Sequence, residues 1–580
     1  MVKSSFARKS RAMTRFLVLV VALLALNYVA RFIFFRIDLT EDSRYTLTEA
    51  SKRVMRNLDN HLYIEIYLDG EMPIEMKKLR ATIKETLDEL KVYAGSRLRY
   101  EFVDIAKEVA PQDLERVYFD LRNSGLSPII VSANAADGSR SEWTLFPGAK
   151  IFYTQSDSLG VFEREVSVNF LENSSDANSD ESLLIAQQNV ETALAGAIAR
   201  IVRKEIPRIA FVQGHGELDE YEVGDICKAL DGYARPEQVT IDGNMNALAG
   251  YSLVIVAKPT QPWSDDDKIV LDQYLMRGGR VAWFVDAVDV HHDSLARGEF
   301  TFALACNHGL DESLFKYGVR LNPDVISDLQ SAFLLVNVAP DGQPADFKLA
   351  PWTYYPLLMP SDEHPITKGL NLIESKYPSS VDMVGRDTAI RKQVLLYSSE
   401  YSRTQSVPAM LSLAQTKERP DPEAYCQQFV PIAMLLEGSF SSAYINRPLQ
   451  QYNHGIPFDF KSKSEPAKMI VVADGDIIRN EVVRRADGTR IFPLGFNRSM
   501  NTQFGNRNFV KNCIFYLLDD DNTMQIRQRE WTLRMLDKTK IYPQRTYWVS
   551  LNTALPLLLP LLAGLFFIGF RKRKFARRSR

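Results

Sequence analysis

The residues best suited to chemistry follow a short apolar run in the stretch "RIAFVQGHGELDE", residues 208–220. His215 and Glu217 stand on a turn that also contains Gly214 and Gly216. A histidine beside a carboxylate can transfer protons, bind a polar ligand or help to hold a metal ion. Such a turn is an active site only if other functional groups converge on it.

Three further carboxylates follow apolar runs in the same way. Asp286 ends "RVAWFVD", and Asp474 and Asp476 end "KMIVVADGD". Because ligands of open α/β sheets bind beyond the carboxyl ends of the strands, these groups and the His215–Glu217 pair are predicted to meet at one rim as a ligand site. In the alternative interpretation, the glycines form turns and the acids cap the helices that follow. Ligand binding or a structural role is favoured over chemistry for this turn.

The familiar catalytic motifs are missing from the sequence. It contains no G-x-S-x-G elbow, no H-E-x-x-H zinc motif, no phosphate-binding G-x-x-x-x-G-K-[ST] and no cysteine in a glycine-rich turn after a strand. We therefore expect no catalytic residue, no cofactor, no metal and no ATP hydrolysis by this chain alone. A degenerate hydrolase that uses His215 remains the enzymatic alternative. The four widely spaced cysteines leave free thiols and disulfides equally open.

Both ends of the chain suggest a membrane. Residues 16–35 and 547–570 are largely apolar and long enough to cross about 30 Å of hydrocarbon. The flanking segments 1–15 and 571–580 carry twelve basic residues and no acidic one. By the positive-inside rule both termini are cytoplasmic, and the body lies on the far side of the membrane. In a bacterium this is the periplasmic side of the inner membrane. Cleavage of the first run as a signal peptide is the alternative.

The charge of the body argues against nucleic acid as a partner. Without the two basic ends, 58 Lys and Arg face 72 Asp and Glu, a net charge near −14. Nucleic-acid-binding domains need clustered positive charge. The partners that fit are instead a lipid bilayer and other proteins.

Periodicity divides the body into two α/β domains. In the first, residues 36–170, an alternating strand at 62–70, an amphipathic helix at 76–94 and a strand at 98–105 predict a parallel β-α-β unit, as in thioredoxin-like folds. There is no C-x-x-C, so redox chemistry is not implied. The polar run within 171–188 is predicted to be a linker.

The second domain, residues 189–520, is predicted to be doubly wound, of a flavodoxin-like or amidotransferase-like kind. Ser264 is a good N-cap, three acids favour the start of the helix that follows, and Gly278 and Gly279 favour its end. The aromatic, proline-rich part of 300–390 is predicted to be an insertion without regular elements. A basic juxtamembrane helix is expected at 521–546.

Six stretches in order resemble a known family. They are "RIDLTEDSRYTLTEASKRVMRNL", "IAFVQGHGELDE", "LVIVAKPTQPW", "DQYLMRGGRVAWFVD", "PWTYYPLLMPSDEHPIT" and "VVADGDIIRN…GNRNFVKN". The chain is similar to the GldG family, the auxiliary, so-called substrate-binding subunit of the gliding-motility-associated ABC transporter of Bacteroidetes-type bacteria. This resemblance implies a separate permease and a separate ATPase as partners. It also implies a second domain of the type found in an intraflagellar transport subunit and distantly similar to class I glutamine amidotransferases, whose nucleophilic cysteine is not recognisable here.

The sequence thus predicts a non-catalytic, membrane-anchored auxiliary subunit that couples a permease and an ATPase to a periplasmic ligand or protein. The rival interpretation is a module that binds a glycan or another envelope polymer. It rests on aromatic residues near the proposed rim, namely Trp263, Trp352, Tyr354 and Tyr355.

Overall fold

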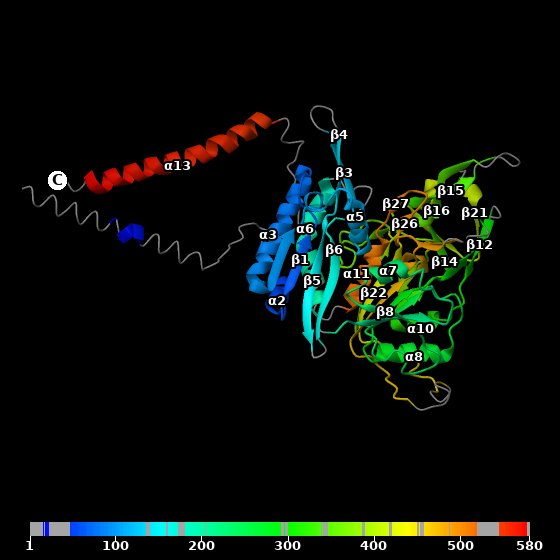
Figure 1. Cartoon of the computed structure of the whole chain (residues 1–580). Helices are drawn as coiled ribbons and strands as arrows, with labels where there is room; N and C mark the ends of the chain where they lie inside the picture. Colours follow the sequence, from blue (N-terminus) through cyan, green and yellow to red (C-terminus); the bar gives the residue numbers. More distant parts are fainter. Residues whose placement is uncertain are drawn as a thin grey trace, which may run out of the picture. The chain divides into compact units, whose positions relative to one another are not determined.

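A computed structural model gives the structure of the chain in two compact units (Figure 1). One unit comprises Met1–Thr46 and Glu530–Arg580, and the other comprises Leu47–Arg529. The residues described are 16, 18–21, 47–134, 140–157, 160–171, 180–203, 205–291, 295, 300–337, 339, 346–385, 389–416, 420–448, 452, 458–485, 488–518 and 544–576.

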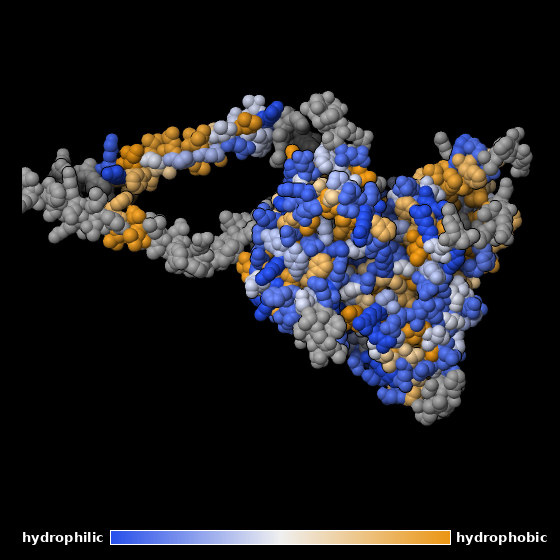
Figure 2. Space-filling model, in the orientation of Figure 1, coloured by the Kyte–Doolittle hydropathy of each residue, from blue (hydrophilic) through white to orange (hydrophobic). Residues whose placement is uncertain are grey.

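The first unit contains helix α13 (Arg545–Ala576), which covers the predicted second span. Within the described residues it is the one helix long and apolar enough to cross a membrane. Figure 2 shows its mostly hydrophobic surface. Two prolines lie inside it, as membrane helices tolerate. The predicted first span is described only at residues 16 and 18–21, which are helical, and the predicted juxtamembrane helix lies almost wholly outside the described residues.

The body begins with a four-stranded sheet in the order β2-β1-β5-β6. Its strands β1 (Leu62–Ile66) and β2 (Leu98–Phe102) are parallel and joined by helix α3 (Ile74–Ala94), which confirms the predicted β-α-β unit. The helix buries Leu79, Ile83, Leu87 and Leu90 completely, as its spacing predicts. Further elements of this region are α2 (Glu49–Arg56), α4 (Ile105–Glu108), α5 (Leu114–Asn123), β3 (Ile129–Asn134), β4 (Arg140–Leu145), β5 (Gly148–Asp157) and β6 (Gly160–Asn169).

Helix α6 (Asp180–Ile201) differs from the prediction for this segment. The second half of the predicted linker 171–188 is helical, and the first residues of the predicted second domain, from 189, belong to the same helix. Instead, α6 packs into the core of the first sheet through Leu183, Val190, Leu194 and Ile198. The polar residues at the start of α6 made the segment resemble a linker, although its apolar residues are spaced to pack into this core.

The second domain is built on a large mixed sheet in the order β15-β16-β19-β22-β23-β10-β9-β7-β8. The strands β8, β7, β9, β10 and β23 are parallel, and the four beyond them are antiparallel. The strand bounds are β7 (Arg208–Gln213), β8 (Arg235–Thr240), β9 (Leu253–Ala257), β10 (Val281–Phe284), β15 (Ser331–Asn337), β16 (Phe347–Pro360), β19 (Ile390–Tyr397), β22 (Pro431–Gly438) and β23 (Ala467–Val472). The order in which successive strands join the sheet reverses at β7, because β8 lies on one side of it and β9 on the other.

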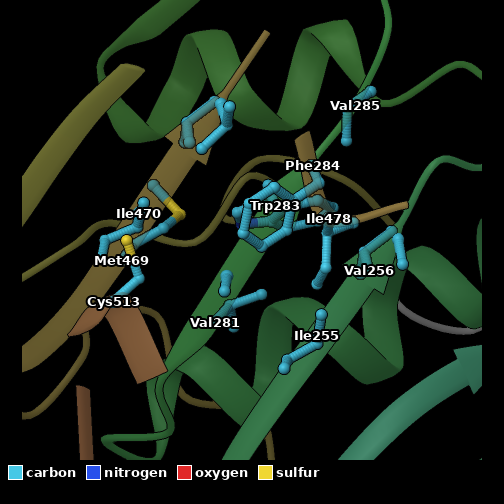
Figure 3. Close-up of a cluster of buried hydrophobic side chains, with 14 of the residues drawn as sticks. Ile255, Val256, Val281, Trp283, Phe284, Val285, Met469, Ile470, Ile478 and Cys513 are labelled. Atoms are coloured by element: carbon cyan, nitrogen blue, oxygen red, sulfur yellow. The ribbon is translucent and has the colours of Figure 1, made fainter. Parts of the chain in front are cut away.

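Helices cover both faces of the parallel strands. Helix α7 (Gly224–Ala229) and helix α11 (Asn506–Leu518) pack together on one face, and α8 (Asp265–Met276) and α10 (Asp311–Tyr317) lie on the other (Figure 1). Figure 3 shows the core between strands and helices, where Ile255, Trp283, Ile470 and Cys513 are among the labelled side chains. All four cysteines of the chain are free thiols. The sheet places the ends of β9, β10 and β23 side by side.

The prediction that 300–390 lacks regular elements is wrong. The segment contains the 14-residue strand β16, in which Trp352 and Tyr354 alternate with outward residues and are almost completely buried. Pro351 is compatible with this strand although it has no N–H to donate. Its partner on β15 is Phe333, whose N–H donates to Met500 Sδ and not to β16, so the two residues form a pair without ladder hydrogen bonds. Its buried side forms a separate core with β12 and β21. The smaller elements are β11 (Val288–Val290), β12 (Phe300–Ala305), β13 (Val319–Leu321), β14 (Asp324–Asp328), β17 (Ile373–Glu374), β18 (Val381–Met383), β20 (Ser402–Ser406), β21 (Ala409–Ser412), β24 (Val482–Arg485), β25 (Gly488–Ile491), β26 (Phe496–Asn497) and β27 (Thr502–Gln503).

Candidate functional site

His215 lies on the turn after β7 and is held between two carboxylates. Its Nδ1 is 3.1 Å from Glu217 Oε1, and its Nε2 is 3.0 Å from Asp267 Oδ2. The His215 backbone N–H also donates to Glu217 Oε2 at 2.6 Å. Gly214 and Gly216 have positive φ angles, which a side chain would make costly, so both are needed to form the turn. The three charged side chains form what we call the histidine cluster: His215, Glu217 and Asp267.

The histidine cluster is closed to solvent. Trp263 stacks on the imidazole with 4.0 Å between ring centroids, and His215 is only 6% exposed. Asp267 accepts two more hydrogen bonds, from the Gly243 N–H and from the Ser264 hydroxyl, both at 2.7 Å. Ser264 is the N-cap of α8, as predicted from the sequence. Asp267, one of the three acids expected only to favour the start of this helix, is therefore also a hydrogen-bond partner of His215.

The charges of this cluster stabilise one another. Burial alone would lower the pKa of His215, but its hydrogen bonds to Glu217 and Asp267 outweigh burial and raise it. Burial would raise the pKa of Asp267, but the Gly243 N–H, the Ser264 hydroxyl and His215 hold it below its ordinary value. The arrangement favours an imidazolium with both ring nitrogens engaged. No ring nitrogen is left to accept a proton from a substrate.

A second group of charges lies where β9, β10 and β23 end. Lys258 Nζ is 2.6 Å from Asp286 Oδ2 and 2.6 Å from Asp476 Oδ2. The same Asp286 accepts the Gly475 N–H through Oδ1 at 2.6 Å. Asp474 completes the group, which we call the lysine cluster: Lys258, Asp286, Asp474 and Asp476.

Asp474 is fully buried and its oxygens are occupied. They accept hydrogen bonds from the Ser375 hydroxyl at 2.5 Å, the Lys376 N–H at 2.8 Å and the Asp476 N–H at 2.7 Å. The backbone of Lys258 has a φ of +53°, an uncommon conformation for a residue with a side chain. Three strand ends are thereby tied together by one strained lysine and three carboxylates.

The electrostatics of the lysine cluster reflect this enclosure. Burial alone would lower the pKa of Lys258, but Asp286, Asp476 and Asp474 outweigh burial and raise it. Burial, with the nearby carboxylates of Asp476 and Asp286, raises the pKa of Asp474. Burial would raise the pKa of Asp476, but Lys258, Lys376 and Arg479 hold it below its ordinary value. The cation thus neutralises a set of acids that could not otherwise remain charged together.

The five residues singled out in the sequence fall into two clusters rather than one. His215 and Glu217 belong to the histidine cluster, and the three aspartates belong to the lysine cluster. The clusters are connected through the segment 258–263. Its Thr260 and Gln261 N–H groups donate to the His215 carbonyl, and the Trp263 N–H donates to the His308 carbonyl. The His308 Nε2 in turn lies 3.1 Å from the Asp286 carbonyl. Their role in ligand contact stays a prediction.

Two members of the clusters were missed from the sequence. Lys258 stands directly after an apolar strand, in the position that made Asp286 and Asp474 candidates, but a lysine at a strand end carries no motif. Asp267 lies in the helix that follows and gave only a capping signal. Within the described residues, no group of three or more His, Cys, Asp and Glu side chains could hold a metal ion.

The aromatic residues that suggested a glycan site do not form a surface. Trp263, Trp352, Tyr354 and Tyr355 are at most 5% exposed. Sugar binding requires an open aromatic face on which a ring can stack. These four side chains belong to protein cores instead.

Comparisons with known proteins give a family and distant structural likenesses. Among curated proteins the chain has no match. Of the solved structures, the mmIFT52 N-terminal domain is 12% identical, with 54% of this chain and 98% of that domain covered and a TM-score of 0.30. Gan42B, a GH42 beta-galactosidase from G. stearothermophilus, is 11% identical, with 60% of this chain and 35% of that chain covered and a TM-score of 0.21. At these TM-scores neither likeness bears on fold or function.

Two family models match the body of the chain. A domain of unknown function, DUF7088, matches residues 41–152. The family described as an ABC-type uncharacterized transport system matches residues 206–513, which is more than half of the chain and includes both charged clusters. The chain therefore belongs to this family of ABC-type transport system auxiliary proteins, which confirms the resemblance that its sequence motifs indicated.

Proposed function

We propose that this chain is a non-catalytic, membrane-anchored auxiliary subunit of an ABC transporter, of the gliding-motility-associated type. The observation that carries the proposal is the match of residues 206–513 to an ABC transport family, in a chain that also contains the membrane-compatible helix α13. The sequence has no phosphate-binding G-x-x-x-x-G-K-[ST], so a separate ATPase supplies the energy and a separate permease supplies the path.

The two clusters support a structural or binding role over catalysis. A general base needs a free lone pair within reach of a substrate, whereas both nitrogens of His215 face carboxylates. A lysine nucleophile needs a lowered pKa, whereas the neighbouring acids raise that of Lys258. Both clusters hold strand ends and loops in place near the boundary between β7 and β9, where the order of strand addition reverses. A ligand that bound there would contact the outer surface of the loops.

The topology we propose follows from the basic ends. Both termini lie in the cytoplasm, two spans cross a bacterial inner membrane, and the body lies in the periplasm. Cys426 is the exposed one of the four free cysteines and so provides a native reporter. A membrane-impermeant maleimide should label it in intact spheroplasts, with a Cys426→Ser chain as the control. Labelling that appears only after lysis would refute this orientation.

We further infer two domains, a thioredoxin-like unit up to residue 170 and a doubly wound, flavodoxin-like domain from 189 to 520. The order β8-β7-β9-β10-β23 supports the second assignment, because it corresponds to the 2-1-3-4-5 order of doubly wound sheets with the direction change between the first and third strands. The parallel pair β1–β2 supports the first. Cys227 lies on α7 and Cys513 on α11, so neither is placed as an amidotransferase nucleophile would be.

Affinity purification in mild detergent tests the transporter assignment. The tagged full chain should recover a permease and an ATPase, because the permease is proposed to contact the spans. A matched chain in which residues 547–570 are replaced by an unrelated membrane helix should keep its body folded and lose the permease. If the intact chain recovers neither subunit, the proposal fails. Because the candidate aromatic residues are buried, no specific observation favours the glycan-binding alternative.

A further inference from the structure

The body is connected to the rest of the chain at two places. Helix α2 lies at its start, since Leu47 is the first residue of this compact unit. Helix α11 is the last described element of the unit and precedes the membrane-compatible helix α13 along the chain. A movement of either end of the chain therefore reaches the body, along the backbone, next to α2 or next to α11. Both helices are in contact with the same third helix, α6.

Glu191 of α6 holds the start of α2. Its Oε1 accepts hydrogen bonds from the Thr48 N–H at 2.7 Å, the Thr48 hydroxyl at 2.9 Å and the Ser51 hydroxyl at 2.6 Å. Thr48 is also the N-cap of α2, and its hydroxyl oxygen accepts the Ser51 N–H. Hydrogen bonds to an ionised acceptor are among the stronger ones, so a carboxylate 143 positions away in the sequence fixes the first turn of α2.

Arg200, near the end of α6, contacts the second domain. Its guanidinium carbon lies 4.0 Å from the ring centroid of Phe515, in the last turn of α11, and 5.2 Å from that of Tyr233. These two rings meet edge to face, with 5.3 Å between their centroids. Gly196 leaves room for the guanidinium, because an added Cβ would lie 3.1 Å from Arg200 Nη1. The attraction of the cation for both rings attaches α6 to the end of α11.

The two contacts lie on opposite sides of α6. Arg200 follows Glu191 by nine positions, which is two and a half helical turns and about 14 Å along the helix axis. The extra half turn directs the two side chains to opposite faces of the helix. The apolar stripe between these faces, with Val190, Leu194 and Ile198, is buried in the core of the first sheet. Helix α6 therefore lies between the start and the end of the body.

Further contacts fix the end of α6 to both domains. Tyr233 packs against the core of the first sheet and against that of the second domain, and its hydroxyl donates to the Ser167 carbonyl on β6 at 3.4 Å. Arg164 of β6 donates to the Ile201 and Arg203 carbonyls, at 3.2 and 2.6 Å, and so satisfies the C-terminal end of α6. A displacement of α6 would thus disturb contacts in both domains.

We propose that α2, α6 and the last turn of α11 form one cooperative unit, in which loosening the chain at either connection loosens the other. Elements that share their stabilising contacts open together in local unfolding. The role of this unit in transport rests on the proposed function: a permease that displaces one membrane segment would pass the displacement through α6 to the other segment. The unit itself depends only on the contacts that α6 makes within the body.

Hydrogen exchange of the full wild-type chain in detergent tests the unit directly. Exchange is followed by mass spectrometry at increasing urea concentrations below the unfolding transition. The amides of α2 and of residues 515–518 should converge on one opening free energy with one urea dependence, whereas those of β9 and β10 should stay protected to higher urea. Separate urea dependences for α2 and residues 515–518 would overturn the proposal.

Two substitutions distinguish a cooperative unit from two local contacts. Glu191→Met removes the acceptor at α2 and should raise amide exchange about tenfold in α2 and also, at a distance, in residues 515–518. Arg200→Met keeps the apolar stem and should have the reciprocal effect on α2, because the coupling free energy between two sites is equal in both directions. Gln188→Ala, at a half-buried position of the same helix, is the control and should change neither region.

The pattern of exchange decides between the outcomes. A rise confined to the region beside each substituted residue would show two independent contacts and contradict the proposal. An equal rise in β9 and β10 would mean that the whole body opens together, which also excludes a separate unit. If either variant fails to fold, the wild-type urea series decides. Recovery of the permease and the ATPase is scored separately, so the transporter assignment can fail while the cooperative unit stands.

Discussion

Replacing Lys258 by methionine would show whether the lysine cluster is a structural tie. The substitution keeps the apolar stem and removes the charge that bridges Asp286 and Asp476, each 2.6 Å from Lys258 Nζ. Asp474 adds a third carboxylate nearby. The variant would leave these acids in a largely buried position without their shared cation. Methionine can occupy the space of the lysine stem, so the effect of the charge is measured with little change in packing.

The expected loss of stability is about 3 kcal/mol. Removing one partner of a buried ion pair typically costs 3–5 kcal/mol, because the remaining charge is left uncompensated. The side chains here are 13–17% exposed, so water screens part of the effect and the lower end of that range applies. For a large domain, this corresponds to a fall of about 6 °C in the unfolding temperature.

The loss should also depend on pH in a defined direction. Without Lys258, the already raised pKa of Asp474 rises further and Asp476 loses the first of the cations that hold its pKa below the ordinary value, so the folded variant binds more protons than the folded wild type. Stability of the variant then falls as pH rises from about 4 through the raised pKa values. The difference between wild type and Lys258→Met should accordingly be smaller at pH 5.5 than at pH 8.

Urea unfolding of the full chain in detergent, followed by tryptophan fluorescence at several pH values, measures both effects. Lys268→Met is the matched control, because Lys268 pairs at 3.2 Å with Asp265, whose side chain is 61% exposed. That change should cost less than about 0.5 kcal/mol. A loss below about 1 kcal/mol for Lys258→Met, or a loss equal at both pH values, would refute the reasoning. A stably folded variant that no longer recovers the permease would assign the cluster to partner binding instead.

Four other changes test further parts of the structure. His215→Gln should flatten the stability–pH curve above about pH 6.5. Because the pKa of His215 is raised, the charged imidazole stabilises the fold below the ordinary pKa, and this stabilisation is lost as pH rises through the raised pKa. Urea midpoints of the two proteins from pH 6 to 9 would show the difference. Burial lowers the pKa of His364 to about 4, so the folded state holds this side chain neutral. The stability of the wild type should therefore fall by about 2 kcal/mol between pH 6.5 and pH 5 through this residue. His364→Asn should remove that pH dependence from acid unfolding curves. Gly475→Ala should cost about 2 kcal/mol in the same unfolding assay, since an added Cβ would lie 2.6 Å from the Cβ of Lys258. Leu558→Arg in α13 should cost about 3 kcal/mol of membrane insertion, so alkaline extraction of membranes should release more of a chain lacking residues 1–35 when that chain carries this change.

The elements that the sequence predicted well are those whose signals are local. Ser264 and the acids after it predicted the start of α8, and the helix runs from Asp265 to Met276. The apolar spacing of α3 predicted its buried face, and the apolar runs before His215, Asp286 and Asp474 predicted β7, β10 and β23. In each of these elements the capping residues or the apolar periodicity agree with the observed packing, so the sequence of the segment alone was enough to predict the element.

The elements that were missed depend on distant contacts. Strand β16 contains prolines and aromatic residues that disfavour a regular element by themselves, but β15 and β19 pair with it and a separate core receives its rings. The pairing of His215 with Asp267 joins residues 52 positions apart, and that of Lys258 with Asp476 joins residues 218 positions apart. No local pattern encodes such pairs, because tertiary packing determines which charges share a buried space.

The position of the two clusters has a consequence for where function resides. In open α/β sheets the carboxyl ends of the strands near the direction change are the usual place for a ligand. In this chain His215 and Lys258 occupy that place with their charges neutralised by acids of the same chain. Polar groups that satisfy one another rigidify a fold and leave little interaction energy for a ligand. Helix α13 instead offers an apolar surface that is long enough to cross a membrane. A body whose strand-end charges are satisfied internally, in a chain with a helix long and apolar enough to cross a membrane, is suited to assembly with membrane proteins, which is the role expected of an auxiliary subunit.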